Sequence, residues 1–381
     1  MSRVLSRTVG GLGLLDIDVE ALVRSQPATA AGLVRFGRSC AVTVLRSDVI
    51  AVLRGALRTT NLVLGARVSG VSPTGALVFS TPSTKEVSER FDLIVAADGI
   101  RSPVRGALLG SDPPPPPAYT GIRIAFARVP RSAFSRSSPS CEVHQWFGPN
   151  GYCLQYTAGG SDSAAQNSGA HCIALCWRDA ASPAAGDNAA WAAGGRDVAA
   201  AMSARLRAGG FPQELQSHLA AASAASSGGA VFEIGVFDTA PLPQDRWWSG
   251  PDAKDNPTPN SNPTQKARGF PHIVLLGDAA HAMPPFLGQG ANQAVQDAAC
   301  LASKLRNMQN SSTSSDMGAA LRAYAAVRCP PTAALQRSSR FVGALDTLQS
   351  PLHVLRDVSL WGAGVSGIAA QIFLAGAMPR V

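Results

Sequence analysis

The stretch HIVLLGDAAHAMPPFLGQGANQAVQD, residues 272–297, carries the strongest structural signal in the chain. Four consecutive apolar residues, Ile273–Leu276, predict a buried strand that Gly277–Asp278 ends. A loop rich in proline and glycine follows, and it leads into a helix that should begin near Gly290. The segment is therefore a strand, a loop and a helix, an arrangement that places the loop where α/β proteins bind ligands.

The residue types in this loop indicate what it could bind. A carboxylate at the end of a strand, here Asp278, can accept hydrogen bonds from sugar hydroxyls. The backbone N–H groups of a helix N-terminus can hold partial negative charge on a ring oxygen. Gly288 and Gly290 have no Cβ, so a flat ring system could lie against their backbone.

A second strand with a polar end lies earlier, in FDLIVAADGIRSPVR, residues 91–105. This apolar run ends in Asp98–Gly99, and Ser102 is placed to cap a short helix that Pro103 opens. Taken alone, Asp-Gly after a strand is commonly just a turn. Its order and separation relative to residues 272–297 make it a stronger indication of a binding site.

Together the two segments resemble the FAD-dependent aromatic hydroxylases, the single-component flavoprotein monooxygenases. The family's G-D-A-A-H, its P-x-x-G-Q-G-x-N and a later Asp are matched by residues 277–281, 285–292 and Asp297, and its D-G fingerprint by residues 98–99. The resemblance implies that Asp278 bonds the ribityl part of FAD. It also implies that residues 288–292 present backbone to the isoalloxazine, and that Asp98 lies near the FAD pyrophosphate and the approach of the nicotinamide cofactor.

Arg46, in LRSDVIAVLRGAL, matches the family's arginine at the start of a helix that reaches toward the flavin, although an arginine on a solvated helix face is the alternative. His281 belongs to the flavin motif and is expected to pack the loop rather than act as a base. No catalytic residue is assigned, and six scattered histidines offer no metal site. The residues predicted to bind the cofactor are Arg46, Asp98, Gly99, Gly277, Asp278, Ala279, Pro285, Gly288, Gln289, Gly290, Ala291 and Asn292.

The usual opening of this family is missing from the sequence. Its members begin with a strand, G-x-G-x-x-G and a helix, which hold the pyrophosphate. Here Gly10–Gly13 is the one candidate, and it is interpreted as a turn because it lacks the third glycine and follows no apolar strand. The resemblance therefore covers residues 40–345, and Leu93–Ala96 should lack a neighbouring strand on one edge unless residues 1–40 supply it. Two alternatives stay open for this start: a misplaced initiation codon, and a genuine loss of the glycine-rich segment.

The resemblance implies an α/β fold, an incomplete FAD-binding Rossmann-like domain of the p-hydroxybenzoate hydroxylase type with an inserted antiparallel-sheet substrate domain. A β-hairpin is predicted within residues 61–80, around Ser72–Gly75. Strand-like runs at 119–128, 142–148, 151–156 and 171–177, a helix at 196–208 and a strand at 231–238 form the inserted domain. The expected division is an FAD-binding domain at 1–112 and 268–345, a substrate domain at 113–249, an insertion at 250–267 and a C-terminal helical tail at 346–381.

Composition describes a globular protein, with 46% hydrophobic and 15% charged residues among 381. The formal charge of +8 comes mostly from scattered arginines, which argues against nucleic-acid binding and mildly favours NADPH or acidic substrates. Seven cysteines without a C-x-x-C pair favour reduced thiols in an intracellular, cytoplasmic setting. A mitochondrial location, from the arginines and serines of residues 1–7, is the alternative. Residues 360–378 are apolar and predict a helix packed on the flavin domain, with a membrane-associated tail as the other interpretation.

The function implied by the resemblance is an FAD-dependent, NAD(P)H-using monooxygenase. It would hydroxylate an aromatic or other electron-rich small molecule with O₂, through a flavin C4a-hydroperoxide. Two alternatives stay open: a non-catalytic or truncated remnant of the flavin-binding fold, and an FAD-dependent reductase or halogenase of the same architecture. Homo-oligomer formation is also left open. The substrate is not readable from the sequence, because its pocket lies in the inserted sheet.

Overall fold

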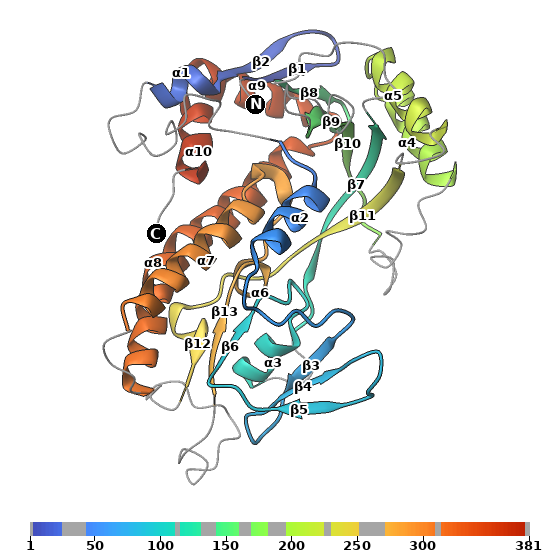
Figure 1. Cartoon of the computed structure of the whole chain (residues 1–381). Coiled ribbons are helices and arrows are strands. Elements are labelled where there is room, and N and C mark those ends of the chain that lie inside the picture. Colours follow the sequence, from blue (N-terminus) through green and yellow to red (C-terminus); the bar gives the residue numbers. More distant parts are fainter. Residues whose placement is uncertain are drawn as a thin grey trace. The chain divides into compact units, whose positions relative to one another are not determined.

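The computed structural model describes residues 3–24, 43–110, 115–130, 142–159, 169–181, 196–224, 230–250, 271–308 and 314–377. The chain divides into two compact units (Figure 1). Unit 1 comprises residues 1–59, 119–236 and 343–375, and unit 2 comprises residues 60–118, 237–342 and 376–381. The predicted insertion at 250–267 lies outside the described residues except for Gly250.

Unit 1 is built on a seven-stranded sheet with the strand order β11-β7-β10-β9-β8-β1-β2. Its strands are β1 (Arg3–Thr8), β2 (Gly13–Asp18), β7 (Ala118–Pro130), β8 (Glu142–Gly148), β9 (Gly151–Ala158), β10 (Ala170–Arg178) and β11 (Ala230–Asp238). Its helices are α1 (Val19–Arg24), α2 (Arg46–Ala56), α4 (Arg196–Ala208), α5 (Gln213–Ala224), α9 (His353–Val365) and α10 (Ile368–Ala377).

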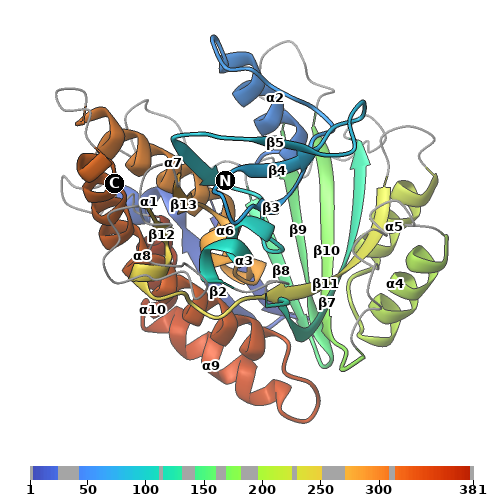
Figure 2. The same ribbon diagram turned by 90° about the horizontal axis from the view of Figure 1, so that it is seen from below.

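The central strands of this sheet form as the sequence predicts. Strands β7, β10, β9 and β8 pair antiparallel in that order, and Figure 2 shows them side by side. Side chains alternate between the two faces. One face packs against α4 and α5 through a core that includes Ile173, Leu175, Met202 and Leu215. The helix predicted at 196–208 is α4, with the same bounds.

The N-terminal hairpin was predicted only in part. The turn predicted at Gly10–Gly13 is confirmed, because β1 and β2 pair antiparallel on either side of it. The strands themselves were missed, since residues 3–9 mix arginine and serine with apolar residues and show no apolar run. Strand β1 also runs parallel to β8, so the sheet is mixed and not purely antiparallel as expected. These strands group with unit 1, whereas the sequence placed residues 1–112 in the flavin domain.

The apolar C-terminal stretch forms two helices and not one. Helix α9 packs against β2 and buries Leu360. The helix ends at Val365, and α10 begins after Ser366 and Gly367. A packed helix is thus observed, although on unit 1. Within the described ranges, no helix is both long and apolar enough to cross a membrane.

Unit 2 holds two small sheets, in the orders β12-β13-β6 and β3-β4-β5. Its strands are β3 (Arg67–Val71), β4 (Leu77–Ser80), β5 (Val87–Glu89), β6 (Leu93–Ala96), β12 (Trp248–Ser249) and β13 (His272–Leu275). Its helices are α3 (Pro103–Leu109), α6 (Asp278–His281), α7 (Gly290–Arg306) and α8 (Ser314–Asp346), the last ending in unit 1, with 3-10 turns η4 (Gln244–Arg246) and η6 (Pro285–Leu287).

The core of unit 2 lies between the β12-β13-β6 sheet and the helices packed on it. Ile94, Val274 and Leu275 from the strands pack with Leu321 and Tyr324 from α8. The predicted hairpin is confirmed as β3 and β4, which pair antiparallel around residues 72–75. This core positions the ends of β6 and β13, which carry the two sequence motifs.

Candidate functional site

The two motifs meet because their strands are neighbours. Strands β6 and β13 pair in parallel, with Leu93–Ala96 opposite His272–Leu275, and Leu276 donates its N–H to the Ala96 carbonyl at 2.9 Å. The carboxyl ends of parallel strands lie at the same edge of a sheet. Asp98–Gly99 and Gly277–Asp278 therefore leave the sheet at one edge.

The turn after β13 depends on Gly277. Its backbone has φ 60° and ψ −138°, a conformation that residues with a Cβ rarely adopt. A Cβ at this position would also lie 3.2 Å from the Cβ of Ala294 in α7. Gly277 thus allows both the sharp exit from the strand and the close approach of α7, and α6 begins at the next residue, Asp278.

Asp278 is the exposed residue in an otherwise buried run from 277 to 282. Crowding by protein atoms raises the pKa of its carboxyl group, and the neighbouring His281 acts in the opposite sense. An exposed carboxylate at the end of a parallel strand is placed to accept hydrogen bonds from a hydroxylated ligand. The ribityl contact of Asp278 itself stays a prediction.

Helix α7 begins at Gly290, as predicted, and its first turn is open. Gln289 precedes it without a side-chain cap, and its side-chain oxygen instead accepts a hydrogen bond from Asn292 at 3.2 Å. A Cβ built on Gly288 or Gly290 would meet no atom within 4 Å. The first backbone N–H groups of a helix carry partial positive charge and need partners. The open surface fits a flat ring such as that of a flavin, and the first N–H groups of the helix suit the partial negative charge on a ring oxygen.

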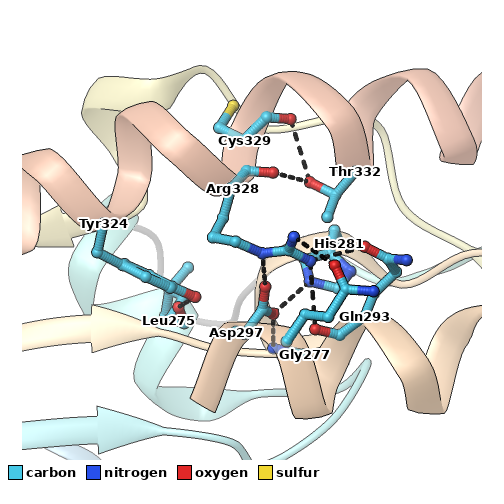
Figure 3. Close-up of polar contacts among 10 residues, drawn as sticks. Leu275, Gly277, His281, Gln293, Asp297, Tyr324, Arg328, Cys329 and Thr332 are labelled. Atoms are coloured by element: carbon cyan, nitrogen blue, oxygen red, sulfur yellow. Dashed lines mark hydrogen bonds and ion pairs between the residues drawn. The ribbon is translucent and has the colours of Figure 1, made fainter. Parts of the chain in front are cut away.

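Asp297 in α7 is hydrogen-bonded to the loop and to Arg328, as Figure 3 shows. Its carboxylate accepts hydrogen bonds from the Gly277 N–H at 2.9 Å, from His281 Nε2 at 2.6 Å and from Arg328 Nε at 2.7 Å. Burial acts to raise the pKa of Asp297, but the hydrogen bonds from His281, Arg328 and Gly277 lower it overall. The strand end, the loop and α8 are thus joined through one buried carboxylate.

Arg328 reaches this carboxylate from α8. Its guanidinium also donates to the side-chain oxygens of Gln293 at 2.6 Å and Gln296 at 3.0 Å. Two prolines follow, at 330 and 331, and the Thr332 hydroxyl donates to the carbonyl of Arg328 at 2.8 Å (Figure 3). Since Arg328 and Asp297 are both fully buried, each needs the other's charge.

His281 packs inside this arrangement. Its ring stacks on Trp247, with centroids 5.5 Å apart, while Nε2 bonds to Asp297. The side chain is 1% exposed, which fits the packing role expected from the sequence. An imidazole buried in this way is poorly placed to exchange protons with a substrate.

The second motif is tied to the first by Arg105. Ser102 caps α3 as predicted, accepting the Arg105 N–H at 2.8 Å, and Pro103 opens the helix. The Arg105 side chain donates to the carbonyls of Ala279 at 3.1 Å and Ile100 at 2.6 Å. Desolvation lowers the pKa of Arg105 and Asp98 raises it. One buried arginine therefore fixes the spacing of the two loops.

Unit 2 brings together the predicted residues of both motifs, from Asp98 to Asn292. Arg46 is different, because it begins α2 in unit 1, a helix with no buried residue. Its flavin contact stays a prediction. Sequence reasoning missed Arg105 and Arg328, although the position of Arg105, three residues after the Ser102 cap, could have drawn attention to it.

One edge of β6 has no strand partner among the described residues. Its other edge pairs with β13, and the described part of residues 1–40 pairs with β8 instead. Val95, in the middle of β6, is 44% exposed. The sequence predicted this unpaired edge, and the described part of the chain confirms it.

The comparisons with known proteins agree with this geometry. Residues 262–338 match the protein family described as an FAD binding domain. A 3-amino-4-hydroxybenzoate 2-monooxygenase of Streptomyces cremeus is 27% identical over 249 residues, 65% of this chain and 48% of that protein. The enzyme PtmB3 of Streptomyces platensis, of the same name, is 29% identical over 276 residues, 72% of this chain and 56% of that protein.

This chain is related to the FAD-dependent aromatic hydroxylases. The FAD-dependent monooxygenase janM of Penicillium janthinellum is 37% identical over 97 residues, 24% of this chain and 20% of that protein. The chain spans about half the length of the two Streptomyces relatives.

Solved structures confirm the predicted fold class. Klebsiella pneumoniae HpxO, complexed with FAD and uric acid, aligns with a TM-score of 0.67 at 20% identity, over 99% of this chain and 81% of that one. A salicylate hydroxylase substrate complex aligns with a TM-score of 0.56 at 21% identity, over 88% of this chain and 75% of that one. At these identities the likeness establishes the fold alone.

Proposed function

We propose that this chain binds FAD and acts as a monooxygenase that hydroxylates an aromatic small molecule, using NADH or NADPH and O₂. The observation that carries the proposal is the pairing of β6 with β13. It sets two acidic strand ends beside the open first turn of α7. The family match at residues 262–338 and the names of the relatives support it.

Each part of the loop has a separate task in this proposal. The Asp278 carboxylate accepts hydrogen bonds from the hydroxyl groups of the ribityl chain. The backbone N–H groups of residues 290–292 face the ring. Asp98 and Gly99 lie toward the pyrophosphate. Asp297 and Arg105 touch no ligand and hold the loops in place. Bound FAD, once reduced, supplies the oxygen-transfer chemistry, and the protein binds, orients and shields.

Two further observations bear on the setting. The five cysteines in the described residues are free and buried, which supports an intracellular, reducing location. The alternative of a non-catalytic remnant is favoured by one feature, the edge of β6 that has no strand partner among the described residues. A remnant of that kind would keep both motifs without holding FAD.

The first experiment is a titration of FAD fluorescence against the protein and its Asp278→Ala variant. Loss of hydrogen bonds to a charged acceptor should weaken FAD binding by about 1–3 kcal/mol. Asp92→Ala, an exposed carboxylate just before β6, is the matched control and should bind FAD as the parent does. Equal affinities for all three proteins would remove Asp278 from the site, and no FAD binding by the parent would favour the remnant.

The second experiment separates a monooxygenase from a reductase or halogenase. Oxygen uptake and NAD(P)H oxidation are measured across a panel of phenolic compounds, and the product masses are recorded. A monooxygenase adds one oxygen atom to a compound that accelerates NAD(P)H oxidation. Turnover that yields only peroxide supports the reductase, and a product that gains halide instead of oxygen supports the halogenase.

A further inference from the structure

Helix α9 has an inner face that the sheet of unit 1 fixes in place. The helix packs against β2, the last strand in the order of that sheet (Figure 1). Arg356, Leu360 and Gly364 lie four residues apart and share the inner face. Arg356 is fully buried and donates to the carbonyl of Gly148 at 2.8 Å. A Cβ on Gly364 would lie 2.5 Å from the carbonyl oxygen of Leu14, so the helix backbone is close against the strand.

The opposite face of α9 is apolar as well, and it is exposed. Large apolar side chains recur there every three or four residues, and the same spacing continues into α10. Each of them is between 42% and 72% exposed, and together they are called the apolar row: Val354, Val358, Trp361, Val365, Ile368 and Ile372. Single exposed apolar side chains are ordinary, whereas a row of this kind marks an interaction surface.

The apolar row is free of charge along most of its length. Residues 358–379 contain no Asp, Glu, Lys or Arg, and Arg380 follows them. Asp357 on α9 pairs with Arg356 at 2.7 Å. On β2, Asp16 pairs with Arg3 at 2.6 Å, and Asp18 accepts a backbone N–H of α1 at 2.8 Å. The acids closest to the row in the chain or on β2 are thus engaged, while the chain as a whole carries a formal charge of +8.

These features favour a lipid surface over a protein partner. Protein interfaces surround an apolar centre with a polar rim, whereas here the uncharged stretch continues through both helices. Trp361 stands in the middle of the row, and tryptophan is enriched where membrane meets water because its ring is amphipathic. A positive net charge draws a protein toward anionic headgroups.

The lengths of the two helices set how they would meet the bilayer. A helix needs about 20 residues to cross the hydrocarbon core. Helix α9 has 13 residues and α10 has 10, and Gly367 turns the chain between them with φ 75°. Short helices with one apolar face lie in the plane of the interface.

We propose that the apolar row binds the surface of a membrane containing anionic phospholipid, with α9 and α10 in the interfacial plane. The side chains of the row enter the boundary between headgroups and acyl chains, and the inner face of α9 stays on β2. The inference goes beyond the proposed function, because it concerns where the protein is held and not what it catalyses.

The test is flotation of the whole chain with lipid vesicles. One set of vesicles is phosphatidylcholine with about 30 mol% phosphatidylglycerol, and the other is phosphatidylcholine alone. The parent should float with the anionic vesicles and bind them at least about 10-fold more strongly than the double variant Val358→Glu/Val365→Glu, which replaces two inserted apolar side chains by charges. Phe341→Glu, at an exposed apolar position of α8 outside the row, is the matched control and should float as the parent does.

Tryptophan fluorescence gives a second readout of the same contact. The emission of Trp361 should move to shorter wavelength when anionic vesicles are added, because its ring leaves water. The other tryptophans among the described residues are buried and should respond little. Trp361→Phe should remove most of the shift and keep vesicle binding, since phenylalanine supplies a similar apolar area.

The outcomes decide between a membrane and a second copy of the chain. No flotation of the parent with anionic vesicles, or equal flotation of the parent and the double variant, overturns the inference. Analytical ultracentrifugation without vesicles tests the rival occupant: a dimer that the double variant dissociates, in a parent that does not float, assigns the row to a second copy. If the double variant does not fold, Val365→Glu alone, at the most exposed position of the row, decides by the same comparison.

Discussion

Replacing Arg328 by Gln should destabilise unit 2 strongly. Arg328 and Asp297 form an ion pair at 2.7 Å, and the side chains of both are 0% exposed. Without the guanidinium, Asp297 keeps only the Gly277 N–H and His281 as partners. The same change takes a donor from Gln293, which holds Arg328 at 2.6 Å.

The expected magnitude follows from burial. Removing one member of a buried ion pair costs about 3–5 kcal/mol, because the other charge stays buried without its partner. In a unit of 150–250 residues each kcal/mol shifts the melting temperature by about 2–4 °C, so the loss is roughly 6–20 °C. Asp297→Asn should cost a similar amount. The double variant should cost less than the sum of the two by about 1–3 kcal/mol, because no charge is left unpaired.

Differential scanning calorimetry and urea denaturation measure these changes. Arg337→Gln, an exposed arginine on the same helix, is the control and should melt within about 1 °C of the parent. A melting temperature of Arg328→Gln that equals the control, or single-variant costs that simply add in the double variant, would refute the role given to the buried pair.

Three further predictions follow from burial and exposure. Burial acts to raise the pKa of Asp297, but hydrogen bonding to His281 and its other neighbours lowers it overall. The stability that Asp297 contributes should therefore be complete above the unfolded pKa of about 3.9 and disappear as pH falls through the lower folded value. Urea titrations from about pH 6 down to about pH 2 cover this window, and Asp297→Asn should flatten the acid limb. Burial raises the pKa of Cys172 to about 11 and of Cys176 to about 12, so peptide mass spectrometry should find both unlabelled by iodoacetamide at pH 8 until urea is added. Val95→Lys, at the open edge of β6, should reduce aggregation in light-scattering measurements with little change in melting temperature, and unchanged aggregation would contradict the exposed edge.

The parts of the fold that follow from neighbouring residues could be predicted. Strand β13, the start of α7 at Gly290 and the Ser102 cap depend on apolar runs, glycine and capping chemistry within a few positions. Strands β1 and β2 could not, because their residues carry no apolar run and are fixed by pairing with β8. Long-range pairing outweighs local preference in strands of this kind.

The candidate site divides in the same way. Asp278 and the glycines could be predicted from their spacing in one motif. Arg105 and Arg328 could not, because their partners lie far away along the chain. Arginines are normally read as solvated surface residues. Only the tertiary structure shows that these two are buried against carbonyls and a carboxylate.

The pairing of β6 with β13 has a consequence for how the protein is made. Residues 97–271, a run of 175, separate the two strands along the chain. At a translation rate of about 5–20 residues per second, roughly 9–35 seconds pass between the synthesis of one strand and the other. Residues 119–236 of unit 1 emerge in that interval and can build much of their own sheet first. During this time the nascent chain presents β6 with both edges bare, so a ribosome-associated chaperone should find its best substrate at this stage, well before any cofactor can be loaded.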